Sequence, residues 1–290
     1  MYYDTLCLSG GSDRGIAFLG VLDYLQENHN FNINNIKSFI GTSVGSIIIF
    51  FINIGYTIHE MGEFILCFDV SKLQNDITVE NLLVRYGLND GCNFVYLLQC
   101  FLNNKLNVND ITFIELYKMT NKKLTIIGTN FTKGIEAVFN HINTPNMSVI
   151  TAVRISISVP LVFTPVLYNN EYYIDGGIVN NMPVNYGNMK TTLAIYIKYN
   201  NSKNNCGSLF EFFKGCMNII SDTITEKDCS DSLNVITVCE EATDIIDFNI
   251  DITKKIKYIH NGQMCAKKYI DSIPTKIASN ILNNIIKNIN

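Results

Sequence analysis

The most constraining feature of the sequence is a short apolar run that meets a glycine- and serine-containing turn and then a longer apolar run. Residues 41–45 read Gly-Thr-Ser-Val-Gly, a G-x-S-x-G pattern between the apolar residues 39–40 and 47–52. A strand that ends in this pattern and continues directly as a helix turns sharply, and its serine is held in a strained conformation with the hydroxyl group exposed. Ser43 is therefore a candidate nucleophile at a helix N-terminus. The pattern alone is weak, because three fixed residues in five recur by chance.

The rest of the chain alternates strand and helix patterns. Residues 5–8 form an apolar run, residues 38–40 form the next, and a helical spacing lies between them at Ile16, Leu19, Leu22 and Leu25. Further strand patterns lie at 123–130, 135–140, 171–174 and 191–199. The helix after Ser43 is apolar on every side, so we expect it in the middle of the domain. Strands that alternate with helices predict an α/β fold, a three-layer α/β/α sandwich with a mainly parallel central sheet.

Composition indicates a folded protein without a nucleic-acid partner. Hydrophobic residues make up 47% and charged residues 17% of the 290 residues, which is enough apolar content for a substantial core. The formal net charge of -4 gives no electrostatic basis for nucleic-acid binding. No basic region of a secretory signal is present, and the apolar run at 47–54 is far shorter than the ~20 residues that span a bilayer. We expect a cytoplasmic protein, or one bound peripherally at intracellular membranes.

The nine cysteines include no C-x-x-C pair. Neither a disulfide framework nor a zinc site is therefore predicted, and we expect mostly buried, reduced thiols. Paired carboxylates with the spacing of a calcium loop are also absent, so we expect no metal and no other cofactor.

Two further segments are candidates for an acyl-transfer site. Residues 9–15 read Ser-Gly-Gly-Ser-Asp-Arg-Gly after the first strand, where successive backbone N–H groups at a helix N-terminus point at one spot. The segment matches neither nucleotide-binding glycine pattern, whereas such donors suit the negative charge of a tetrahedral intermediate. Asp175, followed by two glycines, ends the strand pattern of 171–174, where side chains of parallel α/β sheets usually line the site. Asp-Gly is also a common turn.

Together these segments resemble the patatin-like phospholipases, acyl hydrolases that use a Ser-Asp dyad and lack a catalytic histidine. The pattern of that family is a G-G-G-x-[KR]-G loop, a G-x-S-x-G turn and an Asp-Gly-Gly or Asp-Gly-Ala turn, and all three occur here in that order. Residues 151–160 also look like the helix before the aspartate of the family. The resemblance covers about residues 5–183. One departure is Ser12, which replaces the third loop glycine and must tolerate the φ angle of the loop.

The resemblance implies a lipid acyl hydrolase of the phospholipase A or lysophospholipase type. Ser43 would form the acyl-enzyme, and Asp175 would accept its proton and pass it to the leaving alcohol. An unperturbed aspartate, with a pKa of ~3.9, is a poor base for a serine, so we expect partial burial to raise the pKa of Asp175. The oxyanion hole would come from Gly10, Gly11, Ser12, Asp13, Arg14 and Gly15. Arg14 would anchor this loop. The residues supporting the two turns would be Gly41, Gly45, Gly176 and Gly177.

The resemblance also implies a phospholipid or other fatty-acyl ester as substrate and peripheral contact with a membrane. Apolar and aromatic residues between Phe64 and Phe101 would line an acyl channel. We expect residues 1–200 to form the patatin-like catalytic domain, and residues 201–290 a C-terminal helical extension packed on it. The pattern loosens at 69–110, which we interpret as a lid or substrate-facing insertion, with a peripheral helical subdomain as the alternative. The sequence does not predict an oligomeric state.

Three alternatives stay open. A Ser-His-Asp hydrolase would use His260, because Ser43, Asp175 and His260 follow the chain order of that class. Against it, Ser43 follows only the second strand, and His260 lies in a polar helical context. A catalytically inactive lipid-binding homologue would fit the departure at Ser12. An acyltransferase would use the same residues with an alcohol in place of water.

Overall fold

The computed structural model describes residues 2–28, 31–74, 79–200, 234–241 and 248–289, and, between these ranges, residues 207–208, 211–213, 215–217, 219–220 and 223. Its strands are β1 (Thr5–Leu8), β2 (Ser38–Thr42), β3 (Gly87–Asn89), β4 (Lys123–Asn130), β5 (Ile135–Phe139), β6 (Leu161–Phe163), β7 (Val166–Tyr168), β8 (Glu171–Asp175), β9 (Thr192–Asn200) and β10 (Val235–Glu241). Its helices are α1 (Ile16–Asn28), α2 (Val44–Asn53), α3 (Ile58–Cys67), α4 (Val79–Arg85), α5 (Cys92–Leu106), α6 (Phe113–Thr120), α7 (Val149–Ser156) and α9 (Ile252–Ile289).

The central sheet has the strand order β10-β9-β1-β2-β4-β8-β7, and β5 pairs with β4 outside this order. The pairings from β10 to β4 are all parallel. The pairings of β4 with β5, β4 with β8 and β7 with β8 are antiparallel. The predicted mainly parallel sheet is thus confirmed, and β5, β8 and β7 form an antiparallel edge.

Strand β4 brings two distant segments of the chain together. Its first five residues pair with β2, so that Thr42 lies opposite Ile127. Its last three residues pair with β8, so that Asp175 lies opposite Gly128. Because Ile127 and Gly128 are neighbours in β4, the ends of β2 and β8 meet at the middle of this strand.

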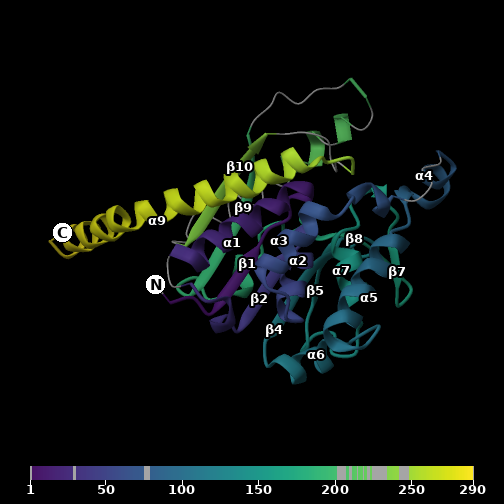
Figure 1. Cartoon of the computed structure of the whole chain (residues 1–290), viewed down its shortest axis with the longest axis horizontal. Coiled ribbons are helices and arrows are strands. Elements are labelled where there is room, and N and C mark those ends of the chain that lie inside the picture. The colour runs from purple at the N-terminus through teal and green to yellow at the C-terminus, as the bar shows by residue number, and fades with distance from the viewer. Residues whose placement is uncertain are drawn as a thin grey trace.

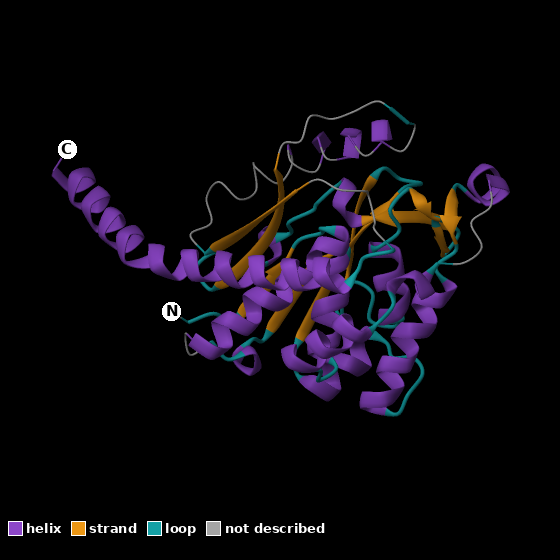
Figure 2. Cartoon of the chain, turned by 45° about the horizontal axis from the view of Figure 1, so that its top comes forward, coloured by secondary structure: helices purple, strands orange, loops and turns teal. Residues whose placement is uncertain are grey.

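The sheet is buried on both faces, as expected for parallel strands. Successive residues of a strand point to opposite faces. In β1, Leu6 and Leu8 pack into the main core, whereas Cys7 packs with Ile40 and Met182 on the other face. The helices gather mainly on one side of the strands (Figure 2). On the other face, Met182 and Val184 pack against Cys7 and Ile40.

Helix α9 lies across α1 (Figure 1), and the two backbones approach closely. A Cβ atom at Gly20 would lie 1.9 Å from the carbonyl oxygen of Ile259, and one at Gly262 would lie 2.1 Å from that of Ala17. Only glycine leaves room for this contact. The segment expected as a helical extension, residues 201–290, lies partly outside the described residues. It contributes strand β10 to the central sheet as well as α9, and the domain boundary at residue 200 stays a prediction.

Several local predictions agree with the structure. The apolar helix after Ser43 is buried along most of its length, as its all-round apolar character indicates. In the segment expected as a lid, the described part folds into a 3-10 turn at Val70–Leu73 followed by α4, β3 and α5.

The cysteines differ from the expectation of burial. Of the described cysteines only Cys7 is buried, whereas Cys67, Cys92, Cys100 and Cys239 are exposed. These four residues are free thiols on helices and on the edge strand β10. Composition alone does not show which positions of a helix or strand face the solvent. Among the residues that the structure describes, none of the helices has both the length and the apolar character needed to cross a bilayer.

Candidate active site

Ser43 sits on a strained turn between β2 and α2. Its backbone has φ 50° and ψ -126°, a left-handed φ that is unfavourable for a residue with a side chain. Its N–H donates to Ser156 Oγ at 2.8 Å, and Ser156 Oγ in turn donates to the Ile127 carbonyl at 2.6 Å. The Ser43 carbonyl accepts from Ser46 Oγ at 2.6 Å. These bonds hold Ser43 in the conformation that the G-x-S-x-G pattern predicts.

The glycines of the two turns allow close crossings of the backbone. A Cβ atom at Gly45 would lie 2.5 Å from the Leu8 carbonyl oxygen, at the end of β1. One at Gly41 would lie 2.8 Å from the carbonyl carbon of Gly45, and one at Gly176 would lie 2.3 Å from the Ile127 carbonyl oxygen. Side chains at these positions would therefore displace the turns that carry Ser43 and Asp175.

The hydroxyl group of Ser43 meets the carboxylate of Asp175. Ser43 Oγ donates to Asp175 Oδ2 at 2.7 Å. The other oxygen, Asp175 Oδ1, accepts from the N–H of Gly177 at 2.6 Å. Ser43 is 8% exposed and Asp175 is 4% exposed. The structure thus joins two residues 132 positions apart in the chain into one hydrogen-bonded pair.

The main chain of Asp175 is fixed on both sides. Its N–H donates to the Ser158 carbonyl at 2.9 Å, and its carbonyl accepts from Thr129 Oγ1 at 2.7 Å. Arg154 is buried and donates to Ser158 Oγ and to the carbonyls of Asp90 and Thr164. Arg154 thereby ties the α7 end that holds Asp175 to the start of α5.

Burial dominates the electrostatics of Asp175. Removal of the carboxylate from water raises the pKa of Asp175 to about 7, against the opposing hydrogen bonds from Ser43 and Gly177. A carboxylate with a pKa near 7 is a much stronger base than an exposed aspartate and is still ionised in part at neutral pH. The direction of this shift is the one expected from the sequence.

The glycine-rich loop lies next to this pair, and its six predicted oxyanion-hole residues differ in their surroundings. A Cβ atom at Gly10 would lie 3.3 Å from Ser43 Cβ, but the N–H of Gly10 already donates to the Asn181 carbonyl at 3.1 Å. Gly10 is therefore not a donor for an oxyanion in this arrangement. Gly11 precedes a 3-10 turn at Ser12–Gly15, and Gly15 packs against Val44.

Ser12, the departure from the family pattern, adopts the backbone conformation of a glycine. Its φ is 55°. The loop thus keeps the left-handed conformation even though a serine occupies this position, with the strain that a Cβ atom adds.

Charged groups from α9 reach this loop. The side chain of Asp13 is 5% exposed, and its Oδ2 accepts from Tyr258 Oη at 3.2 Å and lies 3.8 Å from Lys254 Nζ. Its Oδ1 lies 3.6 Å from Arg14 Nη1. Burial raises the pKa of Asp13, whereas Arg14 and Lys254 act in the opposite direction. Arg14 is 1% exposed and lies over the Tyr199 ring, so it contacts protein groups.

A narrow apolar cavity of about 200 Å³ opens beside Ser43. Of the described residues that line it, Ser12, Asp13 and Ser43 are polar and the others are aliphatic or aromatic. The segment from which an acyl channel was expected contributes Phe64, Ile65, Phe68, Val70, Leu73, Phe94, Leu97 and Phe101. The Ser43–Asp175 pair therefore lies at the polar end of an apolar cavity.

No described histidine hydrogen-bonds to Ser43 or Asp175. His260 is exposed on α9, His59 is exposed beside Glu63, and His141 stacks on Tyr117. His29 lies outside the described residues. Among the residues that the structure describes, side chains of metal-binding type do not form a group of three or more.

Sequence reasoning did not assign roles to several residues that support the site. Ser156 and Ser158 were noted only as part of a family-like helix, and the contacts of Lys254 and Tyr258 with Asp13 were not foreseen. Nothing in the sequence signals Lys254 and Tyr258, which lie about 240 residues from Asp13 along the chain.

The chain is similar to known proteins. A family model described as patatin-like phospholipase matches residues 6–187. A relative called probable lipid hydrolase 463L, of Invertebrate iridescent virus 6, is 38% identical over 211 residues, which are 70% of this chain and 66% of the relative. The uncharacterized protein R571 of Acanthamoeba polyphaga mimivirus is 31% identical over 208 residues, which are 71% of this chain and 68% of R571. The chain thus spans about two thirds of the length of these curated relatives.

A solved structure shows the same fold. The crystal structure of VipD from Legionella pneumophila has a TM-score of 0.61 at 17% identity, over 94% of this chain and 67% of VipD. At this level of identity the likeness concerns the fold.

Proposed function

Because the chain belongs to the patatin-like phospholipase family, we propose that it hydrolyses carboxylic esters of lipids through an acyl-enzyme on Ser43, with Asp175 as the base. The observation that carries this proposal is the 2.7 Å hydrogen bond from Ser43 Oγ to Asp175 Oδ2 at the end of an apolar cavity. The name of the viral relative, probable lipid hydrolase, supports the same class of reaction.

The geometry suits a two-step reaction. In the first step Ser43 Oγ attacks the ester carbon while its proton passes to Asp175 Oδ2, and collapse of the tetrahedral intermediate returns that proton to the leaving alcohol. In the second step a water molecule gives its proton to Asp175 and attacks the acyl carbon, and the proton returns to Ser43 Oγ as the fatty acid leaves. Each step starts and ends with an ionised Asp175, so the protons balance.

The loop at residues 11–13 is the proposed source of oxyanion donors. Ser12 and Asp13 line the same cavity as Ser43, so their backbone lies beside the reacting group. Arg14 and Lys254 lie close to the Asp13 carboxylate and balance its charge next to a site where negative charge develops. We assign the positioning of this loop in part to Lys254 and Tyr258 of α9.

The apolar cavity is the proposed acyl-chain site. Helix α5 and the segment before it supply aromatic and aliphatic side chains that a fatty-acyl chain contacts. We retain the interpretation of residues 69–110 as a lid, since Val70, Leu73, Phe94, Leu97 and Phe101 of this segment line the cavity. Peripheral contact with a membrane and a cytoplasmic or membrane-peripheral location follow from a lipid substrate and are part of this proposal.

Incubation of the purified chain with a mixed lipid extract tests the substrate class. We expect free fatty acids and lysolipids or deacylated products, identified by mass spectrometry, with the wild-type protein and none above background with Ser43→Ala. Acylated alcohols in place of free fatty acids would instead indicate acyl transfer. A lipid extract left unchanged by active, folded protein would contradict a lipid substrate.

Substitution of His260 separates the dyad from a Ser-His-Asp triad. His260 is exposed on α9 and does not contact the Ser43–Asp175 pair, so we expect His260→Ala to retain kcat on a short-chain chromogenic ester within about twofold. The measurement is steady-state kinetics beside the wild-type protein. A loss of 10³-fold or more, the order typical of a missing triad member, would favour the histidine mechanism.

A further inference from the structure

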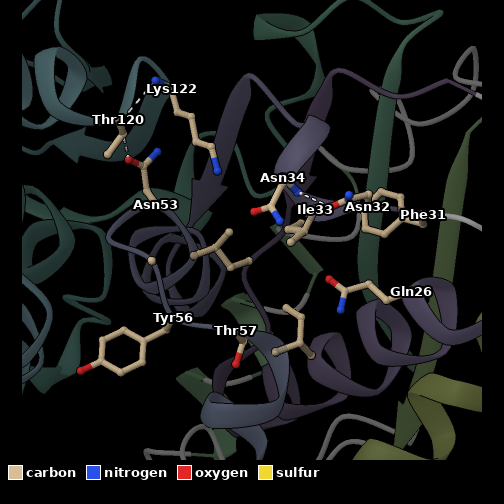
Figure 3. A pocket seen from close by; sticks show the side chains of 13 residues that line it. Gln26, Phe31, Asn32, Ile33, Asn34, Asn53, Tyr56, Thr57, Thr120 and Lys122 are labelled. Atoms are coloured by element: carbon tan, nitrogen blue, oxygen red, sulfur yellow. Dashed lines mark hydrogen bonds between the residues drawn. The ribbon is translucent and has the colours of Figure 1, made fainter.

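A second cavity, of about 700 Å³, lies at the other end of α2 (Figure 3). Helix α2 begins directly after Ser43 and ends at Asn53, and Asn53 lines this cavity. Lys122, which precedes the first residue of β4, also lines it. The cavity therefore lies at the edge of the sheet where β2 and β4 begin, whereas the Ser43–Asp175 pair lies where β2 ends.

The charge of this cavity is positive. None of the thirteen described residues that line it is acidic, and Lys122 is its cation. No described carboxylate lies within 4.0 Å of Lys122 Nζ, which lies over the Phe39 ring at 5.6 Å from its centroid. Partial burial lowers the pKa of Lys122. A partly desolvated ammonium group without a counter-ion is unfavourable, and an anion placed beside it would remove this penalty.

The same cavity contains a buried donor without a partner. Asn53 is 3% exposed, and its Oδ1 accepts from Thr120 Oγ1 at 3.3 Å. Its Nδ2 has no hydrogen-bond partner, although buried amide groups are nearly always satisfied. The missing acceptor is consistent with a bound molecule that supplies an oxygen atom at this wall.

Polar side chains from three separate segments face this space. Figure 3 shows Lys122, Asn34 and Gln26 directing their polar ends toward a common centre. Carboxamides both donate and accept, so Asn34 and Gln26 match hydroxyl groups, whereas Lys122 donates to an anionic group. The volume of about 700 Å³ lies in the range of small-molecule sites and is far larger than one inorganic ion needs.

We propose that this cavity binds a small hydroxylated organic anion, with its phosphate or carboxylate group on Lys122 and its hydroxyl groups on Asn53, Asn34 and Gln26. The site is separate from the acyl cavity and stands whether or not the chain hydrolyses lipids. Its ligand is distinct from a lipid substrate, because its anionic and hydroxyl groups match Lys122 and the carboxamides of the lining.

Binding of sn-glycerol 3-phosphate and of glycerate, measured by isothermal titration calorimetry on the full chain at low ionic strength, tests this site. We expect saturable binding of at least one anion and none of glycerol. Lys122→Gln should weaken that binding by about tenfold or more, the order of one charge-assisted hydrogen bond, and Asn34→Ala by a few fold. The matched control is Lys118→Gln on the exposed face of α6, which should leave the affinity unchanged.

The outcomes are distinct. Binding that falls in Lys122→Gln and persists in Lys118→Gln supports the site, and preference for one of the two probes identifies the anionic group. Equal affinity of wild-type and Lys122→Gln, equal affinity for glycerol, or no saturable binding of either anion overturns it. Melting temperatures of all variants distinguish loss of binding from loss of folding. Asn34 is exposed, so Asn34→Ala should weaken binding without a change in folding. Repeating the titrations with Ser43→Ala separates this site from the proposed hydrolysis.

Discussion

Both Ser43→Ala and Asp175→Asn are expected to reduce kcat on a short-chain chromogenic ester by at least about 10³-fold to 10⁴-fold. Alanine removes the oxygen that forms the acyl-enzyme. Asparagine keeps the size and one carbonyl oxygen of the aspartate, but it cannot accept the proton of Ser43 Oγ across the 2.7 Å hydrogen bond. Steady-state kinetics of purified variants with matched circular dichroism spectra provide the measurement.

The two variants also test whether the residues act as one unit. If Ser43 and Asp175 share a single proton transfer, the double variant should be no slower than the worse single variant, because the second change removes nothing further. Asp271→Asn, an exposed aspartate on α9, is the matched control and should keep wild-type kcat. Activity that survives Asp175→Asn would contradict the assignment of Asp175 as base. Additive losses in the double variant would instead indicate that the two residues act in separate steps.

Much of the fold could be predicted because the sequence marks its element boundaries with local chemistry. Thr57 and Thr112 each form a capping box, with Glu60 and Glu115, that follows the T-x-x-E pattern of the sequence. Short parallel strands are apolar throughout, so β1 and β2 are apparent from residues 5–8 and 38–40. Strand β7 was not apparent, because it has three residues and carries no alternation long enough to distinguish it from a loop.

The proximity of Ser43 and Asp175 is a different kind of prediction, because it depends on register. Residues 41–45 and 175–177 indicate two turns, but their meeting requires β4 to pair with β2 at one end and with β8 at the other. The sequence contains no local signal of that shared strand, and the family resemblance alone implied it. The same limit explains why the contacts of α9 with Asp13 were missed: they depend on how α9 packs across α1, which Gly20 and Gly262 permit but do not specify.

The buried carboxylate of Asp175 predicts a marked pH dependence of activity. Because burial raises the pKa of Asp175 to about 7, the base is protonated below that pH and cannot accept the proton of Ser43. We expect log kcat/KM to fall by about one unit for each pH unit on the acid side, with its midpoint near 7. A profile flat from pH 5 to 8 would contradict the raised pKa of Asp175, since an exposed aspartate would titrate near 3.9.

The raised pKa of Asp175 also predicts that stability falls as the pH rises, which is the opposite of the trend in activity. The two trends together distinguish the titration of Asp175 from the titration of another group. The folded-state pKa of Asp175 lies above its unfolded value, so the folded state binds the proton more tightly, and this contribution to stability is present at low pH. It is lost as the pH rises from about 4 through 7, and a shift of this size amounts to roughly 4 kcal/mol at full ionisation.

Asp175→Asn removes the ionisation, so the variant should melt at a higher temperature than the wild-type protein at pH 8 while being inactive. The difference in melting temperature should shrink toward pH 5, and urea denaturation across this range provides the free energies of unfolding. If the stability difference between this inactive variant and the wild-type protein did not change with pH, the pKa of Asp175 would not be raised by burial. The loss of activity on the acid side would then require the titration of another group.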